Sequence, residues 1–91
     1  GEDHPGLYRQ TLSMTNEEVH WVRPDLSIED GEALDVSARI RYRQPLCDAK
    51  LHRVGNHHYL HFIEPQRGIA AGQFAAWYHG NELIGSGVIH K

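Results

Sequence analysis

Residues 34–42 read LDVSARIRY, a strict alternation of apolar and polar side chains. Alternation with a period of two is typical of a β-strand that buries one face. We therefore expect the apolar positions, from Leu34 to Tyr42, to face a core, and the polar positions to face outward. Arg39 and Arg41 belong to the outward set, and Arg43 continues it. The segment thus predicts a half-buried strand that carries a row of three arginines.

Short strand-like runs flank this segment on both sides. Turn residues separate them, including Gly55-Asn56, Glu64–Gly68, Ala71–Gln73 and His79–Asn81, whereas residues 15–18 are compatible with a helical turn. No apolar pattern with a period of 3.6 residues is sustained anywhere. The sequence therefore predicts an all-β barrel or sandwich, with further strands at residues 7–14, 19–22, 50–54, 59–63, 74–78 and 82–89.

The chain has room for one small domain. It has 91 residues, of which 40% are hydrophobic, and its single cysteine cannot close a disulfide within the chain. No apolar run of about 18 residues and no signal peptide is present, so we expect a cytoplasmic protein without a membrane partner. The chain starts at Gly1 and its only methionine is Met14, and we therefore expect a piece of a larger protein.

Charge is distributed unevenly along the sequence. Residues 1–35 contain nine acidic and two basic residues, for a balance of −7, whereas residues 36–91 contain seven basic and three acidic residues, for +4. A basic region in an acidic protein indicates a surface that faces a polyanion, because the local potential steers a phosphate backbone. A solvated sheet face with arginines for solubility is the alternative interpretation.

The arginine row is the main candidate site for nucleic acid. Side chains at alternate positions of one strand are about 6–7 Å apart, close to the spacing of phosphates along a nucleic-acid strand. The alternative is that carboxylates on adjacent strands, such as Asp35, Asp48 and Glu64, neutralise the row. The predicted RNA-binding residues are Arg39, Arg41 and Arg43, with Lys50, Arg53 and Arg67 as weaker candidates.

Two other kinds of site are not expected. His57 and His61 share one strand face and His58 lies on the other, but the sequence has neither a CxxC nor an HExxH motif, so surface histidines are favoured over a metal site. No sequence signal places an activating base beside Cys47, which argues against nucleophilic catalysis.

The glycines and large aromatic residues near the end of the chain are expected to be structural. Gly85-Ser86-Gly87 lacks the spacing of a phosphate-binding loop, and glycine within a strand usually permits a bulge or a close approach of the backbone. The aromatic residues are expected to pack in the core or at a barrel end, and they are Trp21, Trp77, Tyr78 and Phe74.

Four segments in order resemble the carboxy-terminal domain of bacterial tRNA-specific 2-thiouridylases. They are ARIRYRQP at residues 38–45, EPQR at 64–67, AGQFAAWY at 71–78 and LIGSGVI at 83–89. The front of the chain is also similar, with HPGLY at residues 4–8 and VHWV at 19–22, so the resemblance covers nearly the whole chain. Ala71 and Ser86 depart from the family pattern, which more often has proline and glycine there.

The resemblance implies a small six-stranded β-barrel like those of translation elongation factors. In the family, this domain follows an ATP-binding α/β domain and a small central domain. The complete enzymes, known by an older name as tRNA methyltransferases, use ATP to activate the C2 oxygen of the wobble uridine. A cysteine-borne persulfide then delivers the sulfur.

The resemblance also implies how the work is divided between domains. The ATP loop and the two catalytic cysteines belong to the amino-terminal domain, and Cys47 matches neither cysteine. This single domain at residues 1–91 is thus expected to be catalytically inert and to bind no cofactor or metal. The implied partners are tRNA, the catalytic and central domains of the parent chain and, for the parent, a sulfur-donor protein. An architectural brace that packs on the catalytic domain without touching RNA is the alternative.

Overall fold

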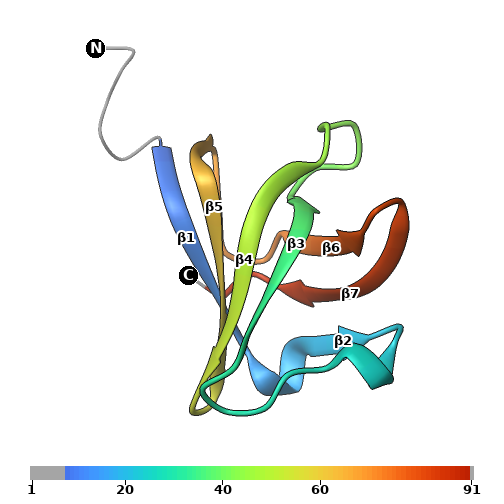
Figure 1. Ribbon diagram of the computed structural model, residues 1–91. Coiled ribbons are helices and arrows are strands. Elements are labelled where there is room, and N and C mark those ends of the chain that lie inside the picture. The colour runs from blue at the N-terminus through green and yellow to red at the C-terminus, as the bar shows by residue number, and fades with distance from the viewer. Residues whose placement is uncertain (1–7, 91) are drawn as a thin grey trace.

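The computed structural model describes residues 8–90, which form a curled, antiparallel β-sheet (Figure 1). The predicted all-β fold is confirmed. The resemblance implied six strands, whereas the described residues form seven, because the three-residue β2 also pairs. The strands are β1 (Tyr8–Thr15), β2 (Val19–Trp21), β3 (Ala33–Arg39), β4 (Cys47–Val54), β5 (His57–Arg67), β6 (Phe74–His79) and β7 (Glu82–Val88).

Two short 3-10 helices complete the described elements. They are η2 (Asn16–Glu18), which confirms the predicted turn between the first two strands, and η3 (Pro24–Leu26). Within residues 8–90, neither helix has the length and apolar character needed to cross a membrane. Leu7, which begins the first predicted strand, lies outside the described residues.

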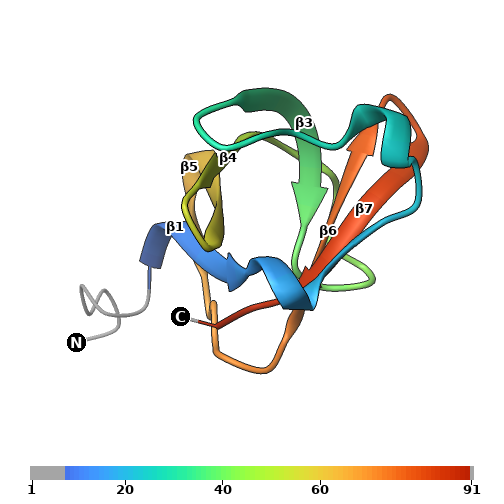
Figure 2. The ribbon, with the colours of Figure 1, turned by 90° about the horizontal axis from the view of Figure 1, so that it is seen from below.

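The sheet has the strand order β1-β5-β4-β3-β6-β7-β2. Strands β1, β5, β4 and β3 lie on one side of the molecule, and β6, β7 and β2 cross them on the other (Figure 1). Strand β3 joins the two groups, because it pairs with β4 along its length and with β6 only at Ser37–Arg39. Viewed from below, the strands surround a common centre (Figure 2).

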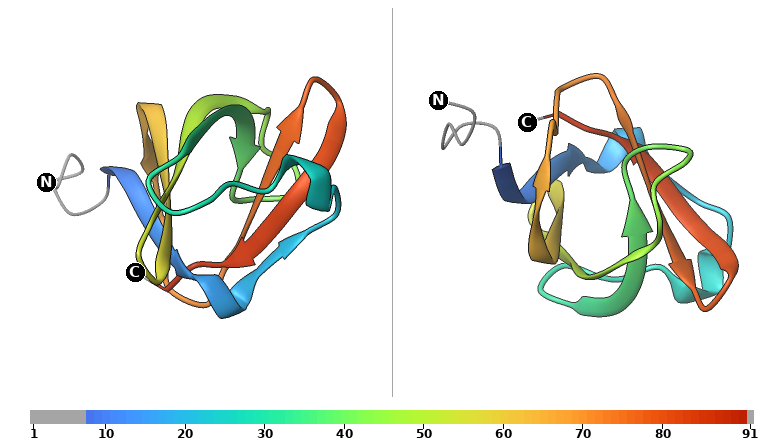
Figure 3. Two further views of the ribbon diagram at one scale, coloured as in Figure 1. Left: turned by 60° about the horizontal axis from the view of Figure 1, so that its bottom comes forward. Right: turned by 90° about the horizontal axis from the view of Figure 1, so that it is seen from above.

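The two edges of the curled sheet are consecutive in sequence. Strands β1 and β2 are the edges, and η2 alone separates them along the chain, so the backbone itself bridges the seam of the barrel. Beyond β7, the His90 N–H donates to the Ser13 carbonyl over 2.7 Å, and Figure 3 shows this end of the chain reaching β1. The curled sheet is therefore bridged at its seam by the chain itself and by this bond, while β1 and β2 do not pair with each other.

The core lies inside the curl and follows the predicted alternation. Val36, Ala38 and Ile40 are buried, as the pattern of residues 34–42 predicts. Trp77 is fully buried at the centre, and the ring of Trp21 meets it edge-on with centroids 5.6 Å apart, so the structural role of both tryptophans is confirmed. A Cβ at Gly85 would lie 2.5 Å from Trp77 Nε1, which confirms that a glycine there permits a close approach.

Strand β3 ends earlier than the alternation predicts. It stops at Arg39, and residues 40–46 form a loop in which Tyr42 is 85% exposed instead of facing the core. The reason is local hydrogen bonding around Gln44. The side-chain Oε1 of Gln44 accepts from the Ile40 backbone N–H over 3.0 Å. The backbone N–H of Gln44 donates to the Arg41 carbonyl over 3.1 Å. These two bonds turn the backbone where the sequence pattern alone would continue the strand.

Strand β5 continues further than predicted. Glu64–Gly68 has the composition of a turn, yet β5 runs through Pro65 to Arg67, which pairs with Tyr8 of β1. A shift in the β1–β5 register, together with a bond from Gln10 Nε2 to the Ile63 carbonyl (3.1 Å), accommodates the irregular pairing there. Pro65 has no backbone N–H to donate to a neighbouring strand. The pairing of β4 with β5 ends at Phe62, so the proline interrupts no hydrogen bond between these two strands.

Candidate nucleic-acid interface

The loop at residues 40–46 is fixed to the end of β5 by a pair of glutamines. Gln44 Nε2 donates to Gln66 Oε1 over 2.6 Å, and Gln66 Nε2 donates in turn to the Glu64 carbonyl over 3.0 Å. The side chain of Gln66 is buried, with 7% of its surface exposed. Because buried amides are costly to leave unpaired, this chain of bonds holds the loop in one position.

Arg41 connects the same loop to the β5–β6 connection. Its Nη2 donates to the Arg67 carbonyl over 2.7 Å and to the Gly68 carbonyl over 3.3 Å. Gly68 has a positive φ of 74°, which favours glycine, and a Cβ on it would collide with the Arg41 guanidinium unless that side chain moved. The carbonyl partners fix the Arg41 side chain without neutralising its charge.

Arg39 is held by aromatic rings. Its Nη2 donates to the Tyr78 hydroxyl over 2.9 Å, and its guanidinium carbon lies 5.3 Å from the Tyr78 ring centroid and 5.5 Å from that of Tyr42. Both distances are within the range of cation–π attraction. The guanidinium is therefore positioned by tyrosines on β6 and on the loop.

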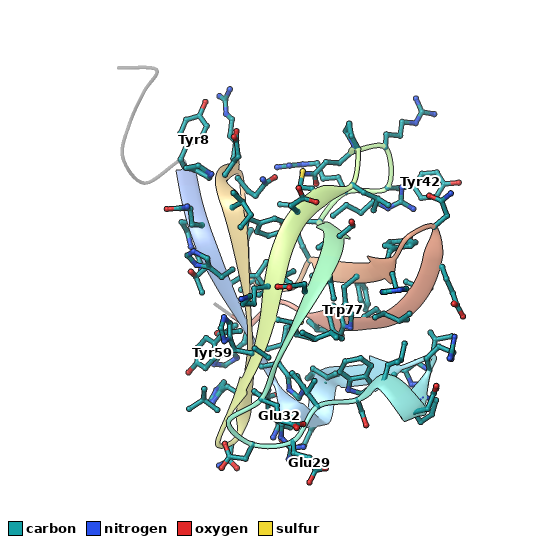
Figure 4. All side chains as sticks on the ribbon, viewed as in Figure 1. Tyr8, Glu29, Glu32, Tyr42, Tyr59 and Trp77 are labelled. Atoms are coloured by element: carbon teal, nitrogen blue, oxygen red, sulfur yellow. The ribbon has the colours of Figure 1, made fainter. Side chains whose placement is uncertain are left out.

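The arginines gather at one end of the barrel. Figure 4 shows Tyr8, at the start of β1, and Tyr42, on the loop, at the end opposite Glu29 and Glu32. Arg43 lies next to Tyr42 in the loop, and Arg67 pairs with Tyr8. We call this surface the arginine end and define it by Arg39, Arg41, Arg43 and Arg67.

Carboxylates of the described residues do not neutralise the arginine end. In residues 8–90 the close ion pairs join Arg23 to Asp25 (2.7 Å) and to Glu82 (2.8 Å), and Lys50 to Asp35 (3.5 Å). The Arg23 guanidinium holds the pKa of the Asp25 carboxyl below its ordinary value through a direct hydrogen bond. Among the described residues, carboxylates thus pair with Arg23 and Lys50, and none forms an ion pair at the arginine end.

The predicted straight row of arginines is wrong in its geometry. Because β3 ends at Arg39, the side chains of Arg41 and Arg43 project from a loop and do not follow the spacing of one strand. The three residues still belong to one end of the molecule.

Two of the weaker candidates lie elsewhere. Lys50 is in the middle of β4, opposite Asp35. Arg53 lies near the β4–β5 hairpin. Its backbone N–H donates to the Glu32 carbonyl over 3.0 Å, and its side-chain Nη1 donates to the Ile28 carbonyl over 3.2 Å. These contacts give Arg53 a structural role in fixing the loop at residues 29–32 before β3. We call it the acidic loop, because three of its four residues are acidic.

An open groove of about 500 Å³ lies between the loop and the start of β6. Arg39, Arg41 and Tyr42 line one part of it, and Phe74 and Tyr78 line another. Phe74 was expected to pack in the core or at a barrel end, and it is not in the core, because 67% of its surface is exposed. Sequence reasoning missed Tyr42 and Phe74 as functional candidates. The sequence signals for them were the placement of Tyr42 between two arginines and the odd spacing of Phe74 from Trp77.

The histidines of β5 take the predicted faces, but the expectation of surface histidines is wrong for His58. His61 is exposed on the outer face, whereas His58 is buried, with 3% of its surface exposed. The side-chain amide of Asn16 donates from Nδ2 to the Gly55 carbonyl. Its Oδ1 therefore faces His58 Nδ1, and the two atoms are 2.8 Å apart. Because an amide oxygen only accepts, His58 carries a proton on Nδ1. Burial, with a smaller contribution from the charge of Arg53, holds the pKa of His58 below its ordinary value.

Metal-ligand groups and reactive thiols give no second candidate site within residues 8–90. The described residues contain no cluster of three or more histidine, cysteine or carboxylate side chains that could hold a metal ion. Cys47 is half-buried, and its thiol lies 3.4 Å from the Pro45 carbonyl. The arginine end and its groove are therefore the main candidate site.

Comparison with known proteins gives one consistent family. Residues 11–89 match the family described as the aminomethyltransferase beta-barrel domain. The tRNA-specific 2-thiouridylase MnmA of Flavobacterium johnsoniae is 59% identical over 96% of this chain, and that of Christiangramia forsetii is 58% identical over 98%. The corresponding protein of Coxiella burnetii is 38% identical over 99%.

The chain spans 22% of the length of the first two of these relatives, so the match is to one domain of each. The resemblance inferred from the four sequence segments is confirmed by these identities. The chain belongs to the aminomethyltransferase beta-barrel domain family, in the form carried by the tRNA-specific 2-thiouridylases.

Proposed function

We propose that this chain is a non-catalytic, tRNA-contacting domain of an ATP-dependent enzyme that makes 2-thiouridine at the wobble position of tRNA in the cytoplasm. The names of the relatives support a tRNA-modifying parent. Resemblance to the family supports a division of labour in which another domain carries the ATP loop and the sulfur-carrying cysteines, and a sulfur-donor protein would serve that domain. The role left to this domain is to position the RNA.

The observation that carries the proposal is the positive charge gathered at the arginine end, which no carboxylate within residues 8–90 pairs with. Arg41 is already fixed by carbonyl groups, and Arg43 and Arg67 are exposed beside it. Guanidinium groups form strong, charge-assisted hydrogen bonds with phosphate oxygens. Contacts to phosphates position an RNA without reading its sequence, so choice among tRNAs would rest on other parts of the enzyme.

A brace on the catalytic domain is the second candidate, and one observation favours it. Ile63 is 62% exposed and Leu46 is 36% exposed, near a groove of about 400 Å³ lined in part by Cys47 and Glu64. Exposed apolar side chains of this kind suit a contact between domains. This surface is separate from the groove that contains Tyr42, so both roles are compatible with one fold.

The experiment measures tRNA affinity of the complete enzyme as a function of salt concentration. The variants are Arg43→Ala, Arg67→Ala and their combination. Each lost phosphate contact reduces the slope of log K against log salt by about 0.7–0.9, so the double variant should lose roughly 1.5. Near-ultraviolet circular dichroism of each variant checks that the fold is intact.

Arg23→Gln is the matched control. It removes the same charge from a position that two carboxylates already neutralise, so the salt slope should stay at the wild-type value. An unchanged affinity and slope in the Arg43/Arg67 double variant would contradict the RNA-contact role and leave the brace.

A further inference from the structure

The groove beside the arginine end has aromatic walls that are left largely in water. Tyr42 is 85% exposed and Phe74 is 67% exposed, and both line the same open groove. Burial of apolar surface drives binding in proportion to the area removed from water. Two large rings left in water on one groove are therefore an unused source of binding energy.

The groove also contains a pre-positioned cation. Arg39 is held between the rings of Tyr42 and Tyr78, with a hydrogen bond to the Tyr78 hydroxyl, and Arg41 lines the same groove. The positions of both guanidinium groups are therefore fixed before any ligand arrives. This fixation reduces the entropy lost on binding.

The combination identifies the ligand class. Single-stranded RNA is bound by aromatic side chains that stack on unpaired bases, next to positive charge that follows the backbone. A volume of about 500 Å³ is within the range of small-ligand sites, and one nucleotide fits it. An apolar protein segment would use the rings but would bring no negative charge to the two arginines.

We infer that this groove binds an unpaired nucleobase of the RNA, which stacks on Tyr42 or Phe74 while Arg39 and Arg41 face the adjoining sugar-phosphate backbone. The inference rests on the proposed RNA contact and adds a base-stacking site to it. Stacking is sequence-tolerant, so the site favours a single-stranded loop over a duplex and does not select a particular base.

The test uses the complete enzyme and an anticodon stem-loop RNA with a fluorescent label, titrated at several salt concentrations. At least one of Tyr42→Ala and Phe74→Ala should weaken binding by about 5-fold or more, which is the low end of the effect of removing one stacked base. The salt slope should not change, because neither side chain is charged. Tyr42→Phe keeps the ring and should restore the affinity.

Phe74→Ala keeps the proposal testable if Tyr42→Ala disturbs Arg39, because the cation–π contacts of Arg39 are to tyrosines alone within residues 8–90. Wild-type affinity in both alanine variants, with a reduced salt slope in the Arg43/Arg67 double variant, would overturn the stacking site and leave the proposed function intact. Wild-type behaviour in all of these variants would overturn both. A lower melting temperature of the complete enzyme in Tyr42→Ala and Phe74→Ala, with unchanged RNA affinity, would assign the groove to contact with another domain and overturn the inference.

Discussion

The fixed position of the arginine end depends on Gly68, and Gly68→Ala tests that dependence. Alanine at a φ of 74° costs about 1 kcal/mol, because the Cβ crowds the backbone in the left-handed region. The new Cβ would also collide with the Arg41 guanidinium and displace it from its two carbonyl partners. Losing these exposed hydrogen bonds should cost a further ~0.5–1.5 kcal/mol, the value of an ordinary hydrogen bond.

Gly80→Ala is the matched control, because Gly80 has a φ of 60° and a Cβ added to it would have no neighbour within 4 Å. Thermal unfolding of the chain, followed by tryptophan fluorescence, is the assay. A domain of this size loses about 4–8 °C of melting temperature per kcal/mol, so Gly68→Ala should melt at least about 2 °C below Gly80→Ala. Equal melting temperatures would refute the argument that Arg41 holds the loop to β5.

Three further predictions concern the fold and its pH dependence. Gly85→Ala should destabilise the chain by about 1–3 kcal/mol in urea unfolding, because its Cβ would lie 2.5 Å from Trp77 Nε1; wild-type stability would show that the core is loosely packed there. The pKa of His58 is lowered by burial, so the unfolded chain takes up a proton that the folded chain does not. The free energy of unfolding should therefore fall as the pH drops below about 6.5, and His58→Gln should reduce this fall; an unchanged profile would contradict it. Arg53→Ala should lower the melting temperature more than Lys50→Ala does, because Arg53 bonds to the Ile28 carbonyl whereas Lys50 forms an exposed ion pair; equal losses would remove the structural role of Arg53.

Most of the fold follows from the sequence because the barrel buries one face of each strand. The alternation in residues 34–40 correctly places Val36, Ala38 and Ile40 in the core. The glycine-marked turns at Gly55 and Gly80 have the positive φ values that such turns require. Period and turn chemistry are local properties, so a single sequence contains them.

The candidate site could be predicted only in part, because its geometry depends on contacts between distant segments. The bond from Gln44 to Gln66 joins residues 22 positions apart, and nothing in the alternation of residues 34–42 indicates it. The same holds for Arg41 and its carbonyl partner on Arg67. The residue types of the arginine end were thus predictable, whereas the loop that arranges them was not.

The position of Phe74 shows a different limit of sequence reasoning. An aromatic residue in a strand is usually buried, and Trp77 in the same strand β6 follows that rule. Phe74 is at the first position of the strand, where the groove opens, and its side chain stays in water. Residue type alone does not distinguish these two positions, whereas the period of two does, because Phe74 and Trp77 lie on opposite faces of the strand.

Photochemical cross-linking of tRNA to the complete enzyme, followed by mapping of the modified peptides, tests the central claim most directly. The claim is that the arginine end contacts the RNA. We expect adducts in the loop at residues 40–46 and around residues 67–74, and none in the acidic loop at residues 29–32. Adducts confined to other domains, with this one unmodified, would contradict the claim and leave a purely architectural role.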